Sequence, residues 1–463
     1  MAPVLWPERQ CAQFVAAIPS RLILYIDVYG DKDAMKKIFI FISIISSIAF
    51  AANVPKQEIF RAIQDSFRVA LRDSIHWLEM EKNTNYTICT DDAHDGTWKG
   101  TDFSFKKENN CIQLNSGNYV KSGKLWYVTK MGNVNTFNLL VGMKYVDLSI
   151  KDHQLGYRGS YSMTRYGEIV YDDSVRYEKM DKILAVDKYK VTECEFVQML
   201  WDSIPSQTSN QLYPNHVFWI EKKRSMEKNG YCDVHDSAAV RVYLYQALIY
   251  ANLRSLKDGL EPVYSFKKID WPSNTTNFEN EGFDIAETSF FSTYVDGYNL
   301  LHVSVSKNAN GYRLPFYNEW MALARGAKKR NYKYIWGGVE YDSTLASQYA
   351  WFGERNSEDP YLKLDLNDPA ERIFMKYSCG EWLQKSRPVG MLKPNDYGLY
   401  DMVGLVCENT LLPYDMFRKG AAVSCKGGFL TDSLVALNLG AHCDDFPNRM
   451  KKYQGLRLVR QIR

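Results

Sequence analysis

Apolar side chains recur at helical spacing in three stretches of the chain, and each stretch predicts an amphipathic helix. The first runs from about Gln57 to Glu81, and the second runs from Val240 to Leu256 and stops before Gly259. The third begins near Pro315, which suits a first helical turn, and ends at Gly326. The apolar positions of the first stretch are Ile59, Ile63, Phe67, Leu71 and Leu78.

A further helix is predicted from a capping pattern. Thr192 and Glu195 form a Thr-x-x-Glu capping box, in which each side chain satisfies a free backbone N–H at the start of a helix. Phe196, Leu200 and Trp201 follow and supply the apolar face of that helix.

Short runs in which apolar and polar residues alternate, separated by Gly-Asn and Ser-Gly turns, predict strands upstream. These runs are Asp102–Phe105, Leu125–Thr129 and Thr136–Val141. Together with the first helix they predict a small α+β domain over residues 52–148, which carries no motif that indicates a function.

The start of the chain carries a targeting signal. Met35 and two lysines precede the apolar run Ile38–Phe50, and Ala49-Phe50-Ala51 fits a cleavage site, so residues 35–51 are predicted to be a signal peptide. The run is shorter than the roughly 20 apolar residues of a membrane span. Residues 1–34 are therefore interpreted as an upstream extension from a mis-assigned start, and the mature chain as an exported protein of bacterial type.

Charge and cysteine content narrow the function classes. The formal net charge is +3 from 57 basic and 54 acidic residues without a basic block, which excludes a nucleic-acid-binding class. Of the nine cysteines, Cys11 lies in the upstream extension, and the eight that remain in the exported chain permit disulfides. Cys89 with Cys111 is the expected pair because both lie in one small segment. The histidines and cysteines do not have zinc-ligand spacing.

The stretch Asn310–Gly326 reads Asn-Gly-Tyr-Arg-Leu-Pro-Phe-Tyr-Asn-Glu-Trp-Met-Ala-Leu-Ala-Arg-Gly. It resembles the signature of the formylglycine-generating enzyme (sulfatase-modifying factor) family. Other short motifs resemble those of the family and occur in the same order as in the family. Together with this stretch they cover about residues 150–463. They are Gly156–Met163, Val186–Phe196, Gly259–Tyr264, Tyr334–Gly337, Ala350–Gly353, Arg387–Gly404, Lys426–Gly428 and Gly455–Arg460.

The resemblance implies a fold. The family has a variant of the C-type-lectin-like fold, an α+β domain with long loops, and it is expected here over residues 149–463. Arg313 and Glu319 are constants of the family signature and are interpreted as structural, as a loop anchor and a helix-start carboxylate.

The resemblance also implies copper chemistry, and the sequence departs from it. The family enzymes bind copper(I) through two cysteines that follow the last Gly-Gly and oxidise a substrate cysteine. Counting without gaps from Gly427-Gly428 places Asp432 and Leu437 at those positions. A carboxylate and an alkyl group do not replace two thiolates, so copper and a catalytic residue are not expected. Cys425 and Cys443 flank the region and are interpreted as a disulfide or as two buried thiols.

A calcium site of the family is only partly kept. Glu408 matches a family ligand, whereas Leu405 stands in place of the asparagine ligand and Cys407 and Asn409 replace tryptophans. Calcium at Glu408 is thus an expectation that rests on one hard oxygen ligand. The alternative is a buried carboxylate that satisfies loop N–H groups.

Two pairings of neighbouring residues offer weaker candidates for acid–base or Cys–His chemistry. They are Asp152 with His153, and His442 with Cys443, Asp444 and Asp445. Adjacent residues often face apart, and an oxyanion hole is not evident for either pairing.

The leading hypothesis is an exported, non-catalytic protein that uses its sulfatase-modifying-factor-like domain for ligand or protein binding or for surface structure. The family scaffold carries ligand-binding loops in variable proteins of diversity-generating retroelements. The candidate surface is the loop region 429–448, and the partner is an unidentified peptide, glycan or surface protein. Its candidate residues are Phe429, Thr431, Asp432, His442 and Asp444.

Two alternatives remain open. The chain could be a divergent formylglycine-generating-type oxidoreductase that acts on protein cysteine through Cys425, Cys443 or histidines in a new arrangement. In the other alternative, the N-terminal domain carries the function and the C-terminal domain supports it.

Overall fold

The protein is described here from a computed structural model. It describes residues 56–62, 65–71, 74–92, 96–100, 102–156, 162–163, 169–170, 176–202, 214–229, 236–240, 242, 244–268, 289–294, 300–326, 343–352, 387–411, 423–429, 437, 439, 442–445 and 454–462. The expected signal peptide and the upstream extension lie outside these residues.

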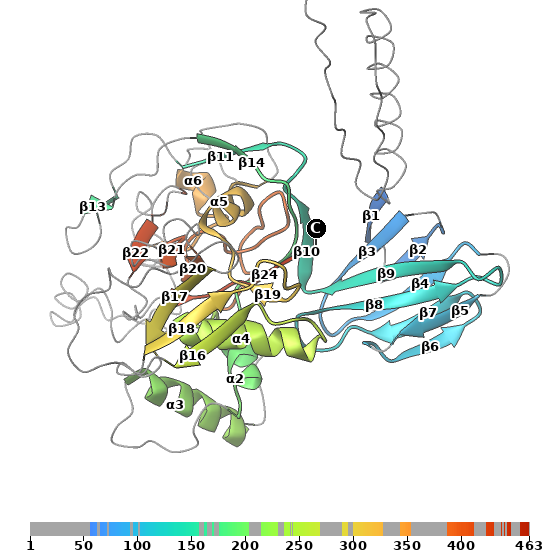
Figure 1. Cartoon of the computed structure of the whole chain (residues 1–463), viewed down its shortest axis with the longest axis horizontal. Coiled ribbons are helices and arrows are strands. Elements are labelled where there is room, and N and C mark those ends of the chain that lie inside the picture. The colour runs from blue at the N-terminus through green and yellow to red at the C-terminus, as the bar shows by residue number, and fades with distance from the viewer. Residues whose placement is uncertain are drawn as a thin grey trace, which may run out of the picture. The chain divides into compact units, whose positions relative to one another are not determined.

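Two sheets with one shared hydrophobic core form the N-terminal region (Figure 1). The first sheet has the order β1 (Lys56–Arg61), β3 (Ser74–Met80), β9 (Val134–Val141), β8 (Lys121–Val128) and β5 (Thr97–Gly100). The second has the order β2 (Ser66–Val69), β4 (Asn85–Thr90), β7 (Cys111–Asn115) and β6 (Phe105–Glu108). The two expected strands Leu125–Thr129 and Thr136–Val141 are confirmed as β8 and β9, and the run Asp102–Phe105 overlaps β6 by one residue.

The helix expected from residue 57 to residue 81 is wrong, because that segment contains β1, β2 and β3. The apolar residues from Ile59 to Leu71 recur every four positions, and a spacing of four repeats one face of a helix and also one face of a strand. In β2, Phe67 and Val69 are buried while Arg68 between them is exposed, which is the strand period. Asp65 has a positive φ of 57° and interrupts any helix there. The N-terminal region is therefore β-rich.

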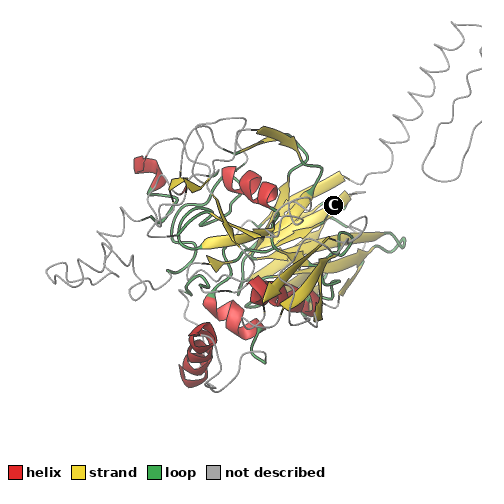
Figure 2. Ribbon diagram, turned by 60° about the vertical axis from the view of Figure 1, so that its left-hand side comes forward, coloured by secondary structure: helices red, strands yellow, loops and turns green. Residues whose placement is uncertain are grey.

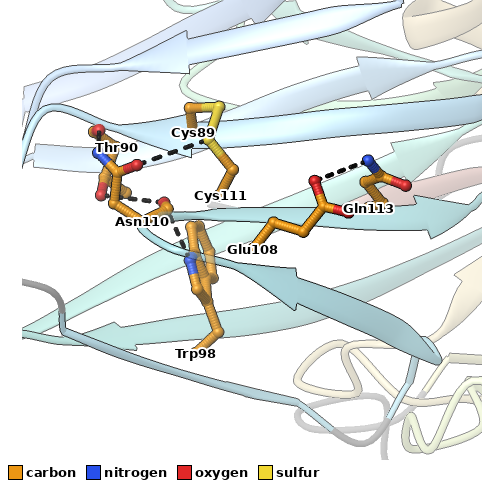
Figure 3. Close-up of a disulfide and its surroundings, with 7 residues drawn as sticks. All are labelled: Cys89, Thr90, Trp98, Glu108, Asn110, Cys111 and Gln113. Atoms are coloured by element: carbon orange, nitrogen blue, oxygen red, sulfur yellow. Dashed lines mark hydrogen bonds between the residues drawn. A yellow bond between two sulfur atoms is a disulfide. The ribbon is translucent and has the colours of Figure 1, made fainter.

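The expected disulfide between Cys89 and Cys111 is confirmed, with an S–S distance of 2.07 Å (Figure 3). The two residues are directly opposed on the antiparallel strands β4 and β7. Next to the disulfide, Asn110 donates its side-chain amide to the Thr90 carbonyl at 2.6 Å, and its own carbonyl accepts the Trp98 indole N–H at 3.2 Å.

An antiparallel sheet lies at the centre of the C-terminal region, and its strands come from distant parts of the chain. Their order is β10 (Met143–Asp147), β15 (Ile183–Asp187), β24 (Val459–Gln461) and β19 (Tyr312–Arg313). All five residues of β15 are buried. Ile183 and Ala185 face one hydrophobic core, and Leu184 and Val186 face another. This sheet therefore separates the two main cores of the region.

Helices cover both faces of the central sheet, so the expected α+β class is confirmed. The core at Ile183 includes residues of α2 (Glu193–Met199), α3 (Pro214–Asn229) and α4 (Leu244–Lys257), and the core at Leu184 includes those of α5 (Tyr317–Arg325) and α6 (Ser343–Ala346). The predicted capping box is present, because the Glu195 N–H donates to Thr192 Oγ1 at 3.2 Å and the Thr192 N–H donates to Glu195 Oε2 at 3.1 Å.

The other two expected helices are confirmed with shifted starts. The second begins at Leu244 in place of Val240, and the third begins at Tyr317, two residues after Pro315. Gly326 caps α5 with a positive φ of 82°, as expected.

Short sheets and loops complete the C-terminal region (Figure 2). One sheet has the order β22 (His442–Asp445), β21 (Val423–Lys426), β20 (Cys407–Leu411) and β23 (Gln454–Gly455). Another has the order β16 (Tyr264–Lys268), β18 (Leu300–Val305) and β17 (Ser289–Tyr294). Two small pairs are β11 (Asp152–Leu155) with β14 (Arg176–Lys179) and β12 (Ser162–Met163) with β13 (Ile169–Val170). Within the described part of the chain, no helix is both long enough and apolar enough to cross a membrane.

A polar cluster joins β8 of the N-terminal region to the central sheet. The Tyr312 hydroxyl donates to Asp258 Oδ2 at 2.5 Å and lies 2.7 Å from the Ser122 hydroxyl. The Ser122 N–H donates to the same Asp258 oxygen at 2.9 Å, and Arg460 donates to the Ser122 hydroxyl at 2.7 Å. Buried polar groups satisfied in this way fix the contact between the two regions.

Arg313 and Glu319 anchor the start of α5, in agreement with the structural role expected for them. Two guanidinium nitrogens of Arg313 donate to the two Glu319 carboxylate oxygens at 2.7 and 2.8 Å. Lys182 donates to Glu319 Oε1 at 2.9 Å and the Phe316 N–H donates to Oε2 at 2.9 Å. Burial by itself raises the pKa of Glu319, but Arg313 and then Lys182 oppose this and lower it from 4.5 to about 2.

We expect Glu319→Gln to change the acid stability of the protein in a defined pH window. A folded-state pKa of about 2 against 4.5 stabilises the fold above pH 4.5 by roughly 3 kcal/mol, and this contribution is lost as the pH falls from 4.5 towards 2. Urea unfolding between pH 2 and pH 7 should show a lower unfolding free energy for Glu319→Gln at pH 7 and a flatter profile between pH 2 and pH 4.5. The exposed Asp181→Asn is the control. An unchanged slope in Glu319→Gln protein would contradict the pairing.

Candidate functional site

Glu408 is the residue that the sequence analysis named as a possible calcium ligand. It is in β20, whose five residues are all buried, and its side chain is 0% exposed. A buried carboxylate without partners would be strongly unfavourable. Its partners therefore decide what Glu408 does.

Three donors satisfy the Glu408 carboxylate. Lys190 donates to Oε1 at 2.6 Å, and Arg457 donates to the same oxygen at 3.0 Å. The Trp320 indole N–H donates to Oε2 at 2.7 Å. Burial by itself raises the pKa of Glu408, but Arg457 and then Lys190 oppose it and hold that pKa below its usual range.

This geometry does not favour the calcium expectation. A carboxylate that is neutralised by two buried cations offers little attraction for a hard divalent ion, which needs several oxygen ligands. Groups of three or more His, Cys, Asp or Glu side chains able to hold a metal ion are absent from the described residues. The contacts agree with the alternative of a buried carboxylate, although its donors are side chains in place of loop N–H groups. Calcium at Glu408 stays a prediction that the contacts oppose.

Lys190 and Arg457 are members of the site that the sequence reading missed. Both lie inside words used for the family resemblance, Val186–Phe196 and Gly455–Arg460. The sequence did contain an indication, because a lysine and an arginine buried within these family-like motifs require a buried carboxylate as partner. The sequence did not indicate which carboxylate it is.

Two glycines let the loops around Glu408 approach one another. Gly404 has a φ of 75°, and a Cβ there would lie 1.9 Å from the Trp351 carbonyl oxygen. Gly427 has a φ of 87°, and a Cβ there would lie 2.7 Å from the Met402 carbonyl oxygen and 3.0 Å from the Trp320 ring. Only glycine fits such positions. Close packing therefore explains why the family-like motifs contain Gly404 and Gly427.

The five residues expected to form the binding surface differ in burial and in whether the structure describes them. Phe429 is 3% exposed and packs with Trp351, Leu405 and Val406, so the expectation that its side chain forms a surface is wrong. Thr431 and Asp432 lie outside the described residues. His442 and Asp444 lie in β22, where they are opposed to Lys426 and Ser424 of β21.

The positions counted for the copper thiols do not supply a thiol pair. Leu437 is 0% exposed and belongs to the core that contains α5, together with Leu439. Lys426 donates to the Leu439 carbonyl at 2.8 Å, which holds this segment against the sheet. An alkyl side chain in a hydrophobic core does not bind copper(I). The absence of the cysteine pair stays a prediction, because it depends on the count from Gly428.

The interpretation of Cys425 is corrected by the structure. Cys425 forms a disulfide with Cys407, with a Cα–Cα distance of 5.6 Å, and the expected choice between pairing with Cys443 and remaining a thiol did not include this partner. Cys407 stands where the family has a tryptophan, and the sequence did not indicate that it forms a disulfide. Cys443 is directly opposed to Cys425 on β22.

The weaker pairing of Asp152 with His153 has a structural explanation. His153 is 3% exposed, and its Nε2 lies 2.8 Å from the Leu148 carbonyl oxygen. Burial lowers the pKa of His153. The side chain therefore ties β11 to Leu148, the residue that follows β10.

The family model for the Sulfatase-modifying factor enzyme 1-like domain matches residues 158–462. The chain belongs to the sulfatase-modifying factor family. This confirms the expectation drawn from the Asn310–Gly326 signature, and α5, Glu408 and Arg457 are elements of this sulfatase-modifying-factor domain.

Curated relatives and solved structures add three similarities. The chain is 32% identical over 228 residues to the Chaperone protein LppX of Paenibacillus barcinonensis. The aligned region covers 48% of this chain and 68% of that protein. Treponema denticola variable protein 1 has 21% identity and a TM-score of 0.42, covering 70% of this chain and 95% of its own. PvdO from Pseudomonas aeruginosa has 15% identity and a TM-score of 0.37, covering 69% of this chain and 94% of its own.

We expect Glu408→Gln to destabilise the sulfatase-modifying-factor domain by about 3–5 kcal/mol, because it leaves Lys190 and Arg457 buried beside a neutral amide. Thermal unfolding measures the loss. In the same experiment, added calcium should leave the melting temperature of the unaltered protein unchanged, since a ligand that binds only the folded state raises it. A calcium-dependent rise that Glu408→Gln abolishes would support the calcium expectation and contradict the ion-pair assignment.

Proposed function

We propose that this protein is exported and that its sulfatase-modifying-factor domain binds another polypeptide without catalysing a reaction. The observation that carries the proposal is the commitment of Glu408 to Lys190, Arg457 and Trp320, together with the burial of Leu437. Glu408, which matches the family's calcium site, and Leu437, which the count places at a copper-thiol position, thus both serve packing.

The similarity to a protein named as a chaperone supports a binding role for a polypeptide ligand. Export is supported by the disulfides Cys89–Cys111 and Cys407–Cys425, since disulfides persist in oxidising compartments. The segment between β21 and β22, which contains Thr431 and Asp432, is the candidate contact surface.

The proposed binding role is tested with a client that aggregates when heated, such as citrate synthase. The protein should suppress light scattering in proportion to its concentration. Thr431→Lys combined with Asp432→Lys should weaken the apparent affinity roughly tenfold, or about 1.4 kcal/mol, by changing the charge of the contact surface. Asp181→Lys, an exposed site outside that surface, is the matched control and should behave as the unaltered protein does.

The oxidoreductase alternative is tested on the same preparation. Copper(I) is added, and metal stoichiometry and oxygen-dependent conversion of a cysteine peptide are measured. Stoichiometric copper with turnover that is lost in Cys425→Ser or Cys443→Ser would overturn the non-catalytic proposal. Equal suppression of aggregation by the surface variant and its control would remove region 429–448 as the contact surface.

We expect the mature exported protein to begin near Ala52, because Ala49-Phe50-Ala51 fits a signal-peptidase site. Expression of the full chain in a bacterial host, followed by terminal sequencing of the exported fraction, measures the start. Ala49→Arg combined with Ala51→Arg should block processing, whereas Ala62→Arg should not. Retention of residues 1–34 in the exported protein would contradict the signal-peptide assignment.

A further inference from the structure

A small cavity lies beside the end of α5, between that helix and β11. Its lining includes Lys151, Gln154, Arg325 and Gly326. The empty space is about 240 Å³ when the part open to solvent is counted, and the enclosed part has room for about one water-sized group. A ligand can therefore insert only its end into the cavity, and the rest of the ligand stays in solvent.

Gln154 presents an unused side-chain amide in this cavity. It is 3% exposed, and neither its side-chain nitrogen nor its side-chain oxygen has a hydrogen-bond partner among the residues that the structure describes. Its backbone carbonyl accepts the Arg325 Nε–H at 2.9 Å, which fixes the position of the residue. A buried amide without hydrogen bonds is unfavourable. A ligand that satisfies this amide must offer both an acceptor and a donor.

The cavity carries positive charge. Lys151 and Arg325 both line it, whereas the carboxylate of Asp152 in the same lining belongs to an exposed residue. Burial lowers the pKa of Lys151, Asp396 opposes this, and Arg325 lowers the pKa of Lys151 further. Burial also lowers the pKa of Arg325, to about 10. An anion beside these two cations would offset the cost of their burial and their mutual repulsion.

The end of a helix ordinarily disfavours an anion, but side chains already neutralise part of the end of α5. Lys151 donates to the Gly326 carbonyl at 3.4 Å. Asn395 donates to the Leu323 carbonyl at 2.8 Å and to the Ala324 carbonyl at 3.4 Å. The carbonyl oxygens of the last turn therefore have donors of their own, and the two cations decide the sign of the charge that the cavity favours.

We propose that this cavity binds the terminal carboxylate of a polypeptide. A carboxylate oxygen accepts from the Gln154 amide and from the Lys151 ammonium, and the last backbone N–H of the polypeptide donates to the Gln154 side-chain oxygen. A chain terminus thus supplies both the acceptor and the donor that the amide needs. Tyr177 is directly opposed to Gln154 on β14 and is 52% exposed, so its ring offers an apolar contact to the last side chain of the polypeptide.

A small free carboxylate has the same chemistry as a chain terminus. The assignment of the carboxylate to a polypeptide rests on the proposed function, whereas the carboxylate site itself rests on the cavity, the amide and the charges. The experiment separates the two sources.

The site is tested by fluorescence anisotropy on the full exported chain, with a fluorescein-labelled alanine–glycine hexapeptide that has a free carboxyl terminus. The same peptide with an amidated terminus is the matched control and should bind at least tenfold more weakly, because it lacks the charge. Unlabelled N-acetylglycine should compete with the free terminus, and N-acetylglycinamide should not. Equal binding of the two hexapeptides would overturn the inference.

Two substitutions remove the proposed contacts. Gln154→Leu removes both polar groups of the amide and Lys151→Gln removes one charge, and each should weaken binding of the free terminus at least tenfold. Lys106→Gln removes an exposed charge on β6 and should bind as the unaltered protein does. Gln154→Leu should also keep or raise the melting temperature of the ligand-free protein, because it removes buried polar atoms that have no partner. Unchanged affinity in Gln154→Leu would mean that the cavity holds only water, and would overturn the inference.

The two sources of the carboxylate give different competition results. Binding of the hexapeptide at least threefold tighter than that of N-acetylglycine supports a polypeptide ligand, and equal binding overturns that part of the inference. If N-acetylglycine binds and the protein does not suppress aggregation, the carboxylate site stands and the proposed function fails.

Discussion

The burial of Glu408 is the constraint on which the rest of the sulfatase-modifying-factor domain depends. A carboxylate with a fully buried side chain requires cationic and hydrogen-bonding partners, and here these come from Lys190, Trp320 and Arg457. Arg457 also donates to the carbonyl oxygens of Asp187, Lys188 and Tyr400. One ionic cluster thus joins the end of β15, helix α5, strand β20 and the segment before β24.

The central sheet makes this cluster compatible with two hydrophobic cores. Strand β15 presents Ile183 and Ala185 to one core and Leu184 and Val186 to the other, so it has no polar face. A second buried ion pair, Arg254 with Asp187 at 2.8 Å, lies at the end of the same strand. Polar groups are therefore confined to the strand end, where loops meet, and the apolar faces pack without interruption.

The described residues around the segment after Gly428 anchor it in the domain. Lys426 donates to the Leu439 carbonyl, Gly427 lies against Trp320 of α5, and Leu437 and Leu439 belong to the core that contains α5. Between and beside these anchors, Cys425 has Cys407 as its bonded partner and Cys443 as its opposed neighbour. The strand that leads into this segment is therefore tied to β20 by a covalent bond.

The sequence by itself determined the features that depend on near neighbours. The capping box of Thr192 and Glu195 and the end of α5 at Gly326 arise from residues close together in the chain, and the family motifs determined the fold class. The Cys89–Cys111 pair was expected because both cysteines lie in one small segment. Between residues 57 and 81 it failed, because a four-residue apolar spacing fits a helix face and a strand face equally well. Only the tertiary structure decided the partners of Glu408 and the bond between Cys407 and Cys425. Lys190 is 218 positions from Glu408, and nothing local selects one buried charge for another across such a separation.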